Sequence, residues 1–202
     1  MKTNASTTRT KWAVDQAHSE IGFKIRHLMI SRVRGSFKIF DASIYTSYKD
    51  FSTAEIDLWI DANSLDTGDT KRDEHLKSPD FFDVKKHSQI TYTSSTIGQP
   101  DADGNRELWG ELTILGITKN IKLNVQFGGI TVDPWGNEKA GFYVSGTINR
   151  TDWGLVWNNL LEAGGMMVGE EVSILCEVEL ANIGEKDLTM QLEPTEQLKM
   201  TK

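Results

Sequence analysis

Apolar and polar residues alternate along most of the middle of the chain. In the segment IGFKIRH, residues 21–27, every second position is Ile, Phe, Ile or His, with Gly, Lys and Arg between them. Similar patterns occur in seven further segments: 35–46, 54–61, 88–97, 108–114, 121–127, 142–148 and 172–178. A period of two is the spacing of residues on one face of a β-strand. The pattern therefore predicts about eight β-strands.

The strand faces and the connections predict the fold class. Strands with one polar face are typical of antiparallel sheets that face water on one side. Turn sequences follow several strands, namely DADGN at 101–105, LGITKN at 115–120 and DPWGN at 133–137. Consecutive strands joined by short turns favour an all-β, eight-stranded antiparallel barrel, with a β-sandwich as the alternative. A barrel of that size is either filled by its own side chains or holds one small ligand, and the pattern does not choose.

One segment between two predicted strands does not alternate. It is TKRDEHLKSPDFFD, residues 70–83. Asp69 or Thr70 is a suitable N-cap for a helix that continues to Leu76, and the proline at position 79 ends it. Such a helix, near 70–77, cannot lie within a sheet. We expect it to cross an open end of the barrel as a lid, with Leu76, Phe81 and Phe82 facing inward.

Charge and composition exclude several classes of partner. The formal net charge is −7, which argues against nucleic acid because that binding needs clustered Lys and Arg. The most basic stretch, SRVRGSFK at 31–38, is interrupted, so a polybasic membrane anchor is not expected. No apolar run approaches the roughly 20 residues of a membrane-spanning helix. The start, MKTNASTTRTKW, lacks the apolar core of a signal peptide, so the expected location is the cytoplasm.

The chain is expected to contain one folded domain. Residues 1–10 are polar and predict a flexible arm, residues 11–180 contain the strands, and residues 181–202 predict a polar tail. The single cysteine, Cys176, lies in a strand pattern and is interpreted as a small buried apolar residue rather than a nucleophile.

Templates for metal binding and catalysis do not match. The four histidines are His18, His27, His75 and His87, and none of them falls in a common ligand motif. The sequence contains no nucleophile elbow, no phosphate-binding loop and no dinucleotide fingerprint. The glycine-rich segment 163–171 precedes a strand, so a tight turn is the better interpretation. We therefore expect no metal, no cofactor and no enzymatic activity.

Four motifs together resemble a known family. They are WAVDQAHSEIGFKIRHL at 12–28, SLDTGDTKRDEHLKSPDFFD at 64–83, GELTILGITK at 110–119 and INRTDWG at 148–154. In this order they resemble the YceI-like family of lipid-binding proteins, over roughly residues 11–180. The resemblance implies a lipocalin-like barrel with an apolar tunnel for a long isoprenoid or similar amphiphilic lipid.

The resemblance turns the inward strand positions into a predicted ligand-binding lining. The residues of this lining are Phe23, Ile25, His27, Phe37, Ile56, Leu58, Ile60, Leu76, Phe81, Phe82, Leu112, Ile114, Leu123, Val125, Phe142, Val144, Ile148 and Arg150. Two of these residues, His27 and Arg150, are polar and share the inward parity of their strands. Arg150 has two interpretations, a contact to a lipid head group or a structural ion pair with an acid. The candidate acids are Asp152, Asp15 and Asp73.

The predicted function is non-enzymatic. The barrel would carry, store or sequester a long-chain isoprenoid or fatty-acyl lipid, held by burial of its apolar atoms. The alternatives are an enzyme that acts on such a lipid, using His27, Arg150 or the Asp152 region, and a solid barrel that serves as an interaction module. The outward positions of Trp59 and Trp109 suggest contacts for a homodimer.

Overall fold

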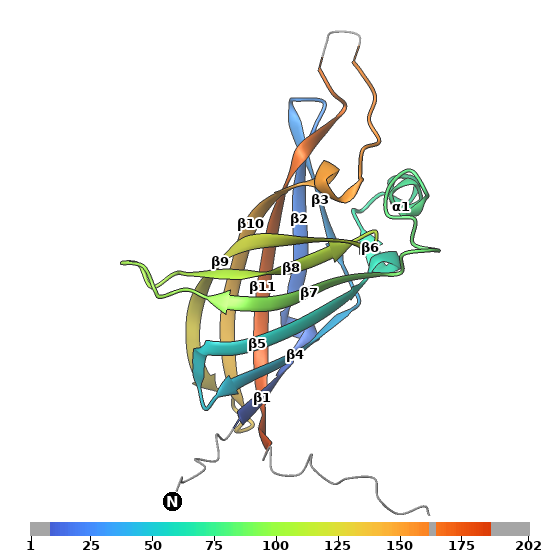
Figure 1. Ribbon diagram of the computed structural model, residues 1–202. Helices are drawn as coiled ribbons and strands as arrows, with labels where there is room; N and C mark the ends of the chain where they lie inside the picture. The colour runs from blue at the N-terminus through green and yellow to red at the C-terminus, as the bar shows by residue number, and fades with distance from the viewer. Residues whose placement is uncertain (1–8, 162–164, 187–202) are drawn as a thin grey trace, which may run out of the picture.

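A computed structural model describes residues 9–161 and 165–186 (Figure 1). Its strands are β1 (Arg9–Val14), β2 (Glu20–His27), β3 (Ser31–Phe37), β4 (Phe40–Ser47), β5 (Asp50–Asp61), β6 (Leu65–Asp66), β7 (Gln89–Ile97), β8 (Arg106–Ile114), β9 (Ile117–Val132), β10 (Glu138–Asn149) and β11 (Val168–Lys186). Its helices are α1 (Thr70–Lys77) and the short 3₁₀ turns η1 (Gln16–His18), η2 (Ala62–Ser64) and η3 (Arg150–Trp153).

The strands close into an antiparallel barrel, as the sequence predicts. Strand β1 pairs with β4 on one side and with β11 on the other, which completes a ring in the order β1-β4-β5-β7-β8-β9-β10-β11. This ring has eight strands, and each pairing in it is antiparallel. Closure removes the exposed sheet edges that promote aggregation.

One end of the barrel is split. The long strand β11 pairs with β1 near its C-terminal end and with β2 near its N-terminal end. Strands β2 and β3 form a hairpin that projects beyond the ring, and β3 pairs further only with the short β6 (Figure 1). Since β6 and β7 do not pair, the wall is interrupted there, on the side where α1 lies. The split fixes where a ligand can enter.

The helix α1 agrees with the prediction. The Asp69 carboxylate accepts a hydrogen bond from the backbone N–H of Arg72 at 2.9 Å, which caps the first turn. Ser78 ends the helix immediately before the proline. Behind it, Leu76, Phe81 and Phe82 pack against the main core. No helix in the described ranges has the length and apolar character needed to cross a membrane.

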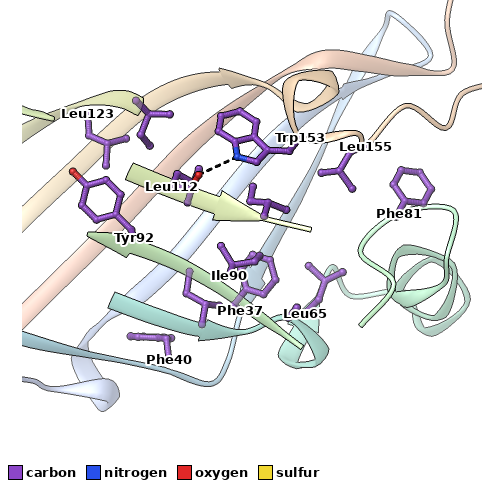
Figure 2. Close-up of a cluster of buried hydrophobic side chains, with 14 of the residues drawn as sticks. Phe37, Phe40, Leu65, Phe81, Ile90, Tyr92, Leu112, Leu123, Trp153 and Leu155 are labelled. Atoms are coloured by element: carbon purple, nitrogen blue, oxygen red, sulfur yellow. Dashed lines mark hydrogen bonds between the residues drawn. The ribbon is translucent and has the colours of Figure 1, made fainter. Parts of the chain in front are cut away.

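The main core surrounds the barrel interior and reaches the lid (Figure 2). Figure 2 shows Phe81 beside α1 at one side of this cluster and Tyr92 and Leu123 at the other. Trp153 of η3 is buried, and its indole N–H donates to the carbonyl of Leu112 at 3.1 Å. Because this bond joins η3 to β8, the turn after β10 is fixed against the barrel wall.

The structure differs from the predicted strands in two places. The segment 35–46 is two strands, because the Ser64 hydroxyl accepts hydrogen bonds from the N–H groups of Lys38 and Ile39 and forms a corner there. This corner lets both Phe37 and Phe40 face the interior, although a continuous strand would put them on opposite faces.

The barrel also extends past its predicted ends. Arg9 and Thr10 already belong to β1, and β11 continues through residues 181–186 to pair with them. Trp12 of β1 is fully buried, and its indole N–H donates to the Thr46 hydroxyl at 3.0 Å. The rest of the predicted arm, 1–8, and of the predicted tail, 187–202, lies outside the described residues.

Candidate functional site

The barrel encloses an apolar cavity of about 680 Å³. It extends from the split end beside α1 to the β4–β5 turn, and side chains from strands around the whole ring line it. Protein interiors normally contain few voids larger than a water molecule. The cavity is therefore a structural feature in its own right and not a packing defect.

Every residue of the predicted lining lies in the cavity wall. The barrel positions are Phe23, Ile25, His27, Phe37, Ile56, Leu58, Ile60, Leu112, Ile114, Leu123, Val125, Phe142, Val144, Ile148 and Arg150, and the positions of the lid segment are Leu76, Phe81 and Phe82. The alternation of the strands brings these residues to one interior surface because inward positions recur every second residue. Their contact with a ligand stays a prediction.

The predicted lining omitted many wall residues that share the same parity. Examples are Ile21 and Val33 on the β2–β3 hairpin, Ile90 and Tyr92 on β7, and Ile174 on β11. Each continues an alternating run, so the signal was present in the sequence. The wall is consequently apolar around its entire circumference.

Tyr92 is a polar exception within this wall. Its ring lies over Gly110, where a β-carbon would come within 2.5 Å of the phenol oxygen. The buried hydroxyl has no hydrogen-bond partner among the described residues, and burial raises the pKa of Tyr92 well above its usual value. The glycine is needed at this position because any larger side chain would displace the ring.

Charged residues gather at the two ends of the cavity. At the split end the wall includes Arg26 of β2 together with Lys71 and Arg72 of α1. At the opposite end it includes Asp50 and Arg106, and the nearby Arg106 contributes to lowering the pKa of Asp50 after its own hydrogen bonds with Ser52. The middle of the cavity is apolar. An elongated ligand with an apolar body and a polar end fits this distribution.

Arg150 is held by the backbone and not by an acid. It is 3% exposed, and its guanidinium donates from Nε to the carbonyl of Gly169 at 2.8 Å and from Nη1 to the carbonyl of Leu155. Burial lowers the pKa of Arg150, and the charge of Glu170 opposes that shift. The expected ion pair is therefore wrong, because η3 turns the chain so that two carbonyls reach the guanidinium first.

The acids considered as partners of Arg150 bind elsewhere. The Asp73 carboxylate accepts from both the N–H and the hydroxyl of Thr67, at 3.0 and 2.5 Å. Asp15 pairs with Lys139 at 2.5 Å. No hydrogen bond or ion pair of the Asp152 side chain occurs within the residues that the structure describes.

Arg72 and His75 anchor the lid. Arg72 donates from Nε to the Thr67 hydroxyl at 2.7 Å and from Nη2 to its carbonyl at 2.9 Å. The His75 ring lies 3.0 Å from the Asp80 carboxylate, and it packs edge-on against Phe81 and Trp157 with centroids 5.2 and 4.7 Å away. These contacts hold α1 against the turns on either side of it.

One group of side chains has the composition of a metal site. Asp15, His18 and Glu179 place ligand atoms within 4.8 Å of one another at the seam between β1 and β11. The ammonium group of Lys139 lies 2.5 Å from Asp15 and 3.1 Å from Glu179. Because a cation of the protein already neutralises both carboxylates, the arrangement fits an ion-pair network. His18 lies in η1, outside the strand that carries His27.

Cys176 lies in the cavity wall on β11. It is buried, and burial raises the pKa of the thiol to about 11. At neutral pH the thiol is therefore protonated and behaves as a small apolar group. This agrees with its interpretation as a structural residue.

Comparison with known proteins identifies close relatives. A family model described as a YceI-like domain matches residues 12–180. A UPF0312 protein of Staphylococcus aureus strain MSSA476 is 37% identical over 173 residues, which cover 85% of this chain and 98% of that relative. A crystal structure of a Campylobacter jejuni YceI protein is 32% identical and superimposes with a TM-score of 0.65, over 84% of this chain and 96% of that one.

A more distant structure shares the fold. It is described as a polyisoprenoid binding domain from Saccharophagus degradans implicated in plant cell wall breakdown. It is 17% identical, has a TM-score of 0.59, and covers 85% of this chain and 98% of its own. At this level of identity the likeness establishes the barrel architecture alone.

Proposed function

The chain belongs to the YceI-like family, and on that premise we propose that it binds one long-chain lipid, isoprenoid or fatty-acyl, inside the barrel. The lipid is carried, stored or sequestered without chemical change. The observation that carries this proposal is the continuous apolar cavity of about 680 Å³. The polyisoprenoid-binding description of the Saccharophagus degradans domain, which shares the fold, is consistent with it.

Energetics favour an occupied cavity. An empty cavity destabilises a protein by about 24 cal/mol per Å³, which for 680 Å³ is on the order of 16 kcal/mol. This exceeds the net stability of most domains, about 5–15 kcal/mol. A buried chain instead gains about 0.8 kcal/mol per CH₂ group. The arithmetic supports a bound apolar chain and speaks against a solid-core interaction module.

We place the polar end of the lipid at the split end of the barrel. Arg26, Lys71 and Arg72 contribute to the wall there, and this end is not fully closed by strand pairing. Arg150 lies in the same region, but two backbone carbonyls already occupy its donors. A phosphate or carboxylate group would therefore meet the rim cations before it meets Arg150.

Blocking the cavity tests the proposal. Val144 faces the interior from β10, whereas Thr147 on the same strand is exposed. We expect added prenyl or long-chain acyl lipids to raise the melting temperature of the wild type, because a ligand at 100 times its Kd stabilises by about 2.7 kcal/mol. The variant Val144→Trp should lose this response, and the outward control Thr147→Trp should keep it.

The same samples separate a carrier from an enzyme. After incubation, the lipid is extracted and its mass is compared with that of the starting material. A carrier returns the lipid unchanged, while a new product that depends on the protein would contradict the non-enzymatic proposal. Loss of the thermal response in both tryptophan variants would contradict binding inside the barrel.

The location and the oligomeric state of the protein stay predictions. A cytoplasmic location rests on the sequence of the first residues. A homodimer rests on Trp59 and Trp109, which the structure places on the outside of the barrel as exposed side chains.

A further inference from the structure

An exposed apolar tip projects from the split end of the barrel. The β2–β3 hairpin ends in three consecutive apolar residues, and the neighbouring segment before β11 adds two more. The apolar tip consists of Leu28, Met29, Ile30, Leu160 and Met166. Ile30 is 87% exposed and Leu160 is 79% exposed. The two segments form one surface, because the N–H of Leu28 donates to the carbonyl of Met167 at 2.8 Å.

The hairpin turn carries side chains that its backbone disfavours. Leu28 has φ 51° and Met29 has φ 62°, both in the left-handed region. That region costs a residue with a β-carbon about 1–2 kcal/mol, and hairpin turns of this kind favour Asn and Gly. Two large apolar residues at these positions weaken the fold and gain no burial in return. Such strain is typical of functional sites.

The outer face of the same hairpin is basic. Strand pairing sets Lys24 directly opposite Arg34, and Arg26 directly opposite Arg32. Like charges in directly opposed positions destabilise a sheet. Within 9–161 and 165–186, none of these four cations forms an ion pair. Neighbouring strands therefore create a cationic surface that the interrupted sequence motif 31–38 does not show by itself.

We propose that this hairpin docks the protein on an anionic lipid bilayer, with the apolar tip inserted at the interface and the four cations against the head groups. Charge complementarity carries the choice of partner, because the chain as a whole has a formal net charge of −7 and yet concentrates cations here. A cluster of Lys and Arg beside inserted apolar side chains is the combination that holds peripheral proteins on anionic membranes.

The position of the tip relative to the cavity gives docking a purpose, and this part rests on the proposed function. His27 lines the cavity and directly precedes Leu28 of the tip. A docked tip would thus bring the split end of the barrel to the bilayer surface. A lipid could then pass between bilayer and barrel without crossing water.

Edge protection and protein binding each account for less of this surface. Cations on β3 protect an edge strand from pairing with other sheets, but edge protection does not require apolar residues at the turn. A protein–protein interface of standard size involves about 20–30 residues on each side, far more than the five of the apolar tip. Insertion into a bilayer needs only a few apolar side chains and nearby cations.

Vesicle flotation tests the proposal directly. We expect the wild type to float with vesicles of equal parts phosphatidylglycerol and phosphatidylcholine, and to bind pure phosphatidylcholine vesicles much more weakly. The double variant Met29→Ser, Ile30→Ser should lose at least about tenfold in binding. The double variant Arg32→Gln, Arg34→Gln should lose roughly fivefold per charge removed, and added salt should reduce wild-type binding.

Matched controls distinguish a specific tip from general stickiness. Trp135 is 83% exposed in the β9–β10 turn at the other end of the barrel, so Trp135→Ser should bind as the wild type does. The double variant Lys85→Gln, Lys119→Gln removes the same charge from other exposed positions and should also leave flotation unchanged. Equal binding by the tip variants and the wild type would overturn the proposal, and so would equal binding to both kinds of vesicle.

A second measurement reads insertion itself. Cys176 is buried, so a polarity-sensitive dye can be attached to a single new thiol in Ile30→Cys or in Trp135→Cys. Anionic vesicles should shift the emission of the dye at position 30 to the blue and leave the dye at position 135 unchanged. No shift at position 30, or equal shifts at both, would overturn insertion of the tip.

The test separates the two proposals. Val144→Trp, which blocks the cavity, should still float with anionic vesicles. If the tip variants keep the thermal response to lipid but the wild type does not float, docking is wrong and lipid binding stands. If the wild type floats but shows no response to lipid, the reverse holds.

Discussion

Asp15 illustrates how single side chains hold the barrel closed. It follows β1 and binds Lys139 of β10, which also contacts Glu179 of β11, so three neighbouring segments meet at one cation. The hydrogen bond from Lys139 is the main cause that lowers the pKa of Asp15 to about 2, and the same contact raises the pKa of Lys139. The charge of Asp15 therefore stabilises the folded state.

This linkage predicts a pH dependence. Because the folded pKa of Asp15 lies below its ordinary value, its stabilisation is complete above pH 4 and disappears as the pH falls from about 4 to about 2. Asp15→Asn should lower the free energy of unfolding at pH 7 by about 1 kcal/mol, the range of a partly exposed ion pair. The difference from the wild type should shrink steadily below pH 4.

Urea unfolding at pH 7 and at pH 3 measures this effect. Asp103→Asn, in the exposed turn between β7 and β8, is the matched control and should match the wild type at both pH values. An Asp15→Asn protein as stable as the wild type at pH 7 would show that the seam does not depend on this ion pair.

The individual wall residues were predictable to different degrees. Phe23 and Val144 follow from the period of two, since inward parity is a local property of a strand. The partners of Arg150 do not follow from any period. They are carbonyls of Leu155 and Gly169, and the path of the chain after η3 brings them to the guanidinium. Parity placed Arg150 correctly in the wall and could not name what satisfies it.

Among the elements, α1 has the most direct bearing on function. It lies at the split end and contributes Lys71, Arg72, His75 and Leu76 to the cavity wall. Its N-terminus is stabilised by the Asp69 carboxylate, and the Arg72 contacts to Thr67 fix it to the preceding turn. The stability of this one helix should therefore control how fast a bound lipid escapes.

Removal of the helix cap tests that role. Asp69→Ala leaves the first backbone N–H groups of α1 without a partner, so the helix should open more often. We expect a fluorescent long-chain acyl lipid to leave this variant roughly fivefold faster than the wild type in a stopped-flow displacement experiment. Asp133→Ala removes a comparable carboxylate–backbone bond, to Trp135, at the other end. Equal release rates in both variants would contradict a gate at α1.

Local signals predicted the elements well and their joints poorly. Capping residues and Pro79 defined α1, because helix ends depend on adjacent residues. The corner between β3 and β4 depends on Ser64, which lies 25 residues beyond Ile39 in the sequence. Strand β1 closes the ring through pairing with residues 181–186, a contact between the two ends of the barrel. Contacts of this range leave no periodic trace.

The whole molecule combines a closed barrel with one open end. The ring of strands excludes water from the cavity wall, the split admits a ligand beside α1, and the apolar tip projects from the same end. Periodicity predicted a barrel of about eight strands but not whether it is hollow, because the free volume depends on how side chains from the entire circumference meet at the axis. The cavity is the property on which the functional account depends.

Mass spectrometry of the protein as purified tests that account most directly. Spectra recorded under native conditions and again after organic extraction would show what occupies the barrel. The account predicts one non-covalent adduct per chain with the mass of a prenyl or long-chain acyl lipid, which is released intact into the organic phase. A protein that carries no adduct, and that added prenyl and acyl lipids do not stabilise, would contradict the binding of a lipid in the barrel.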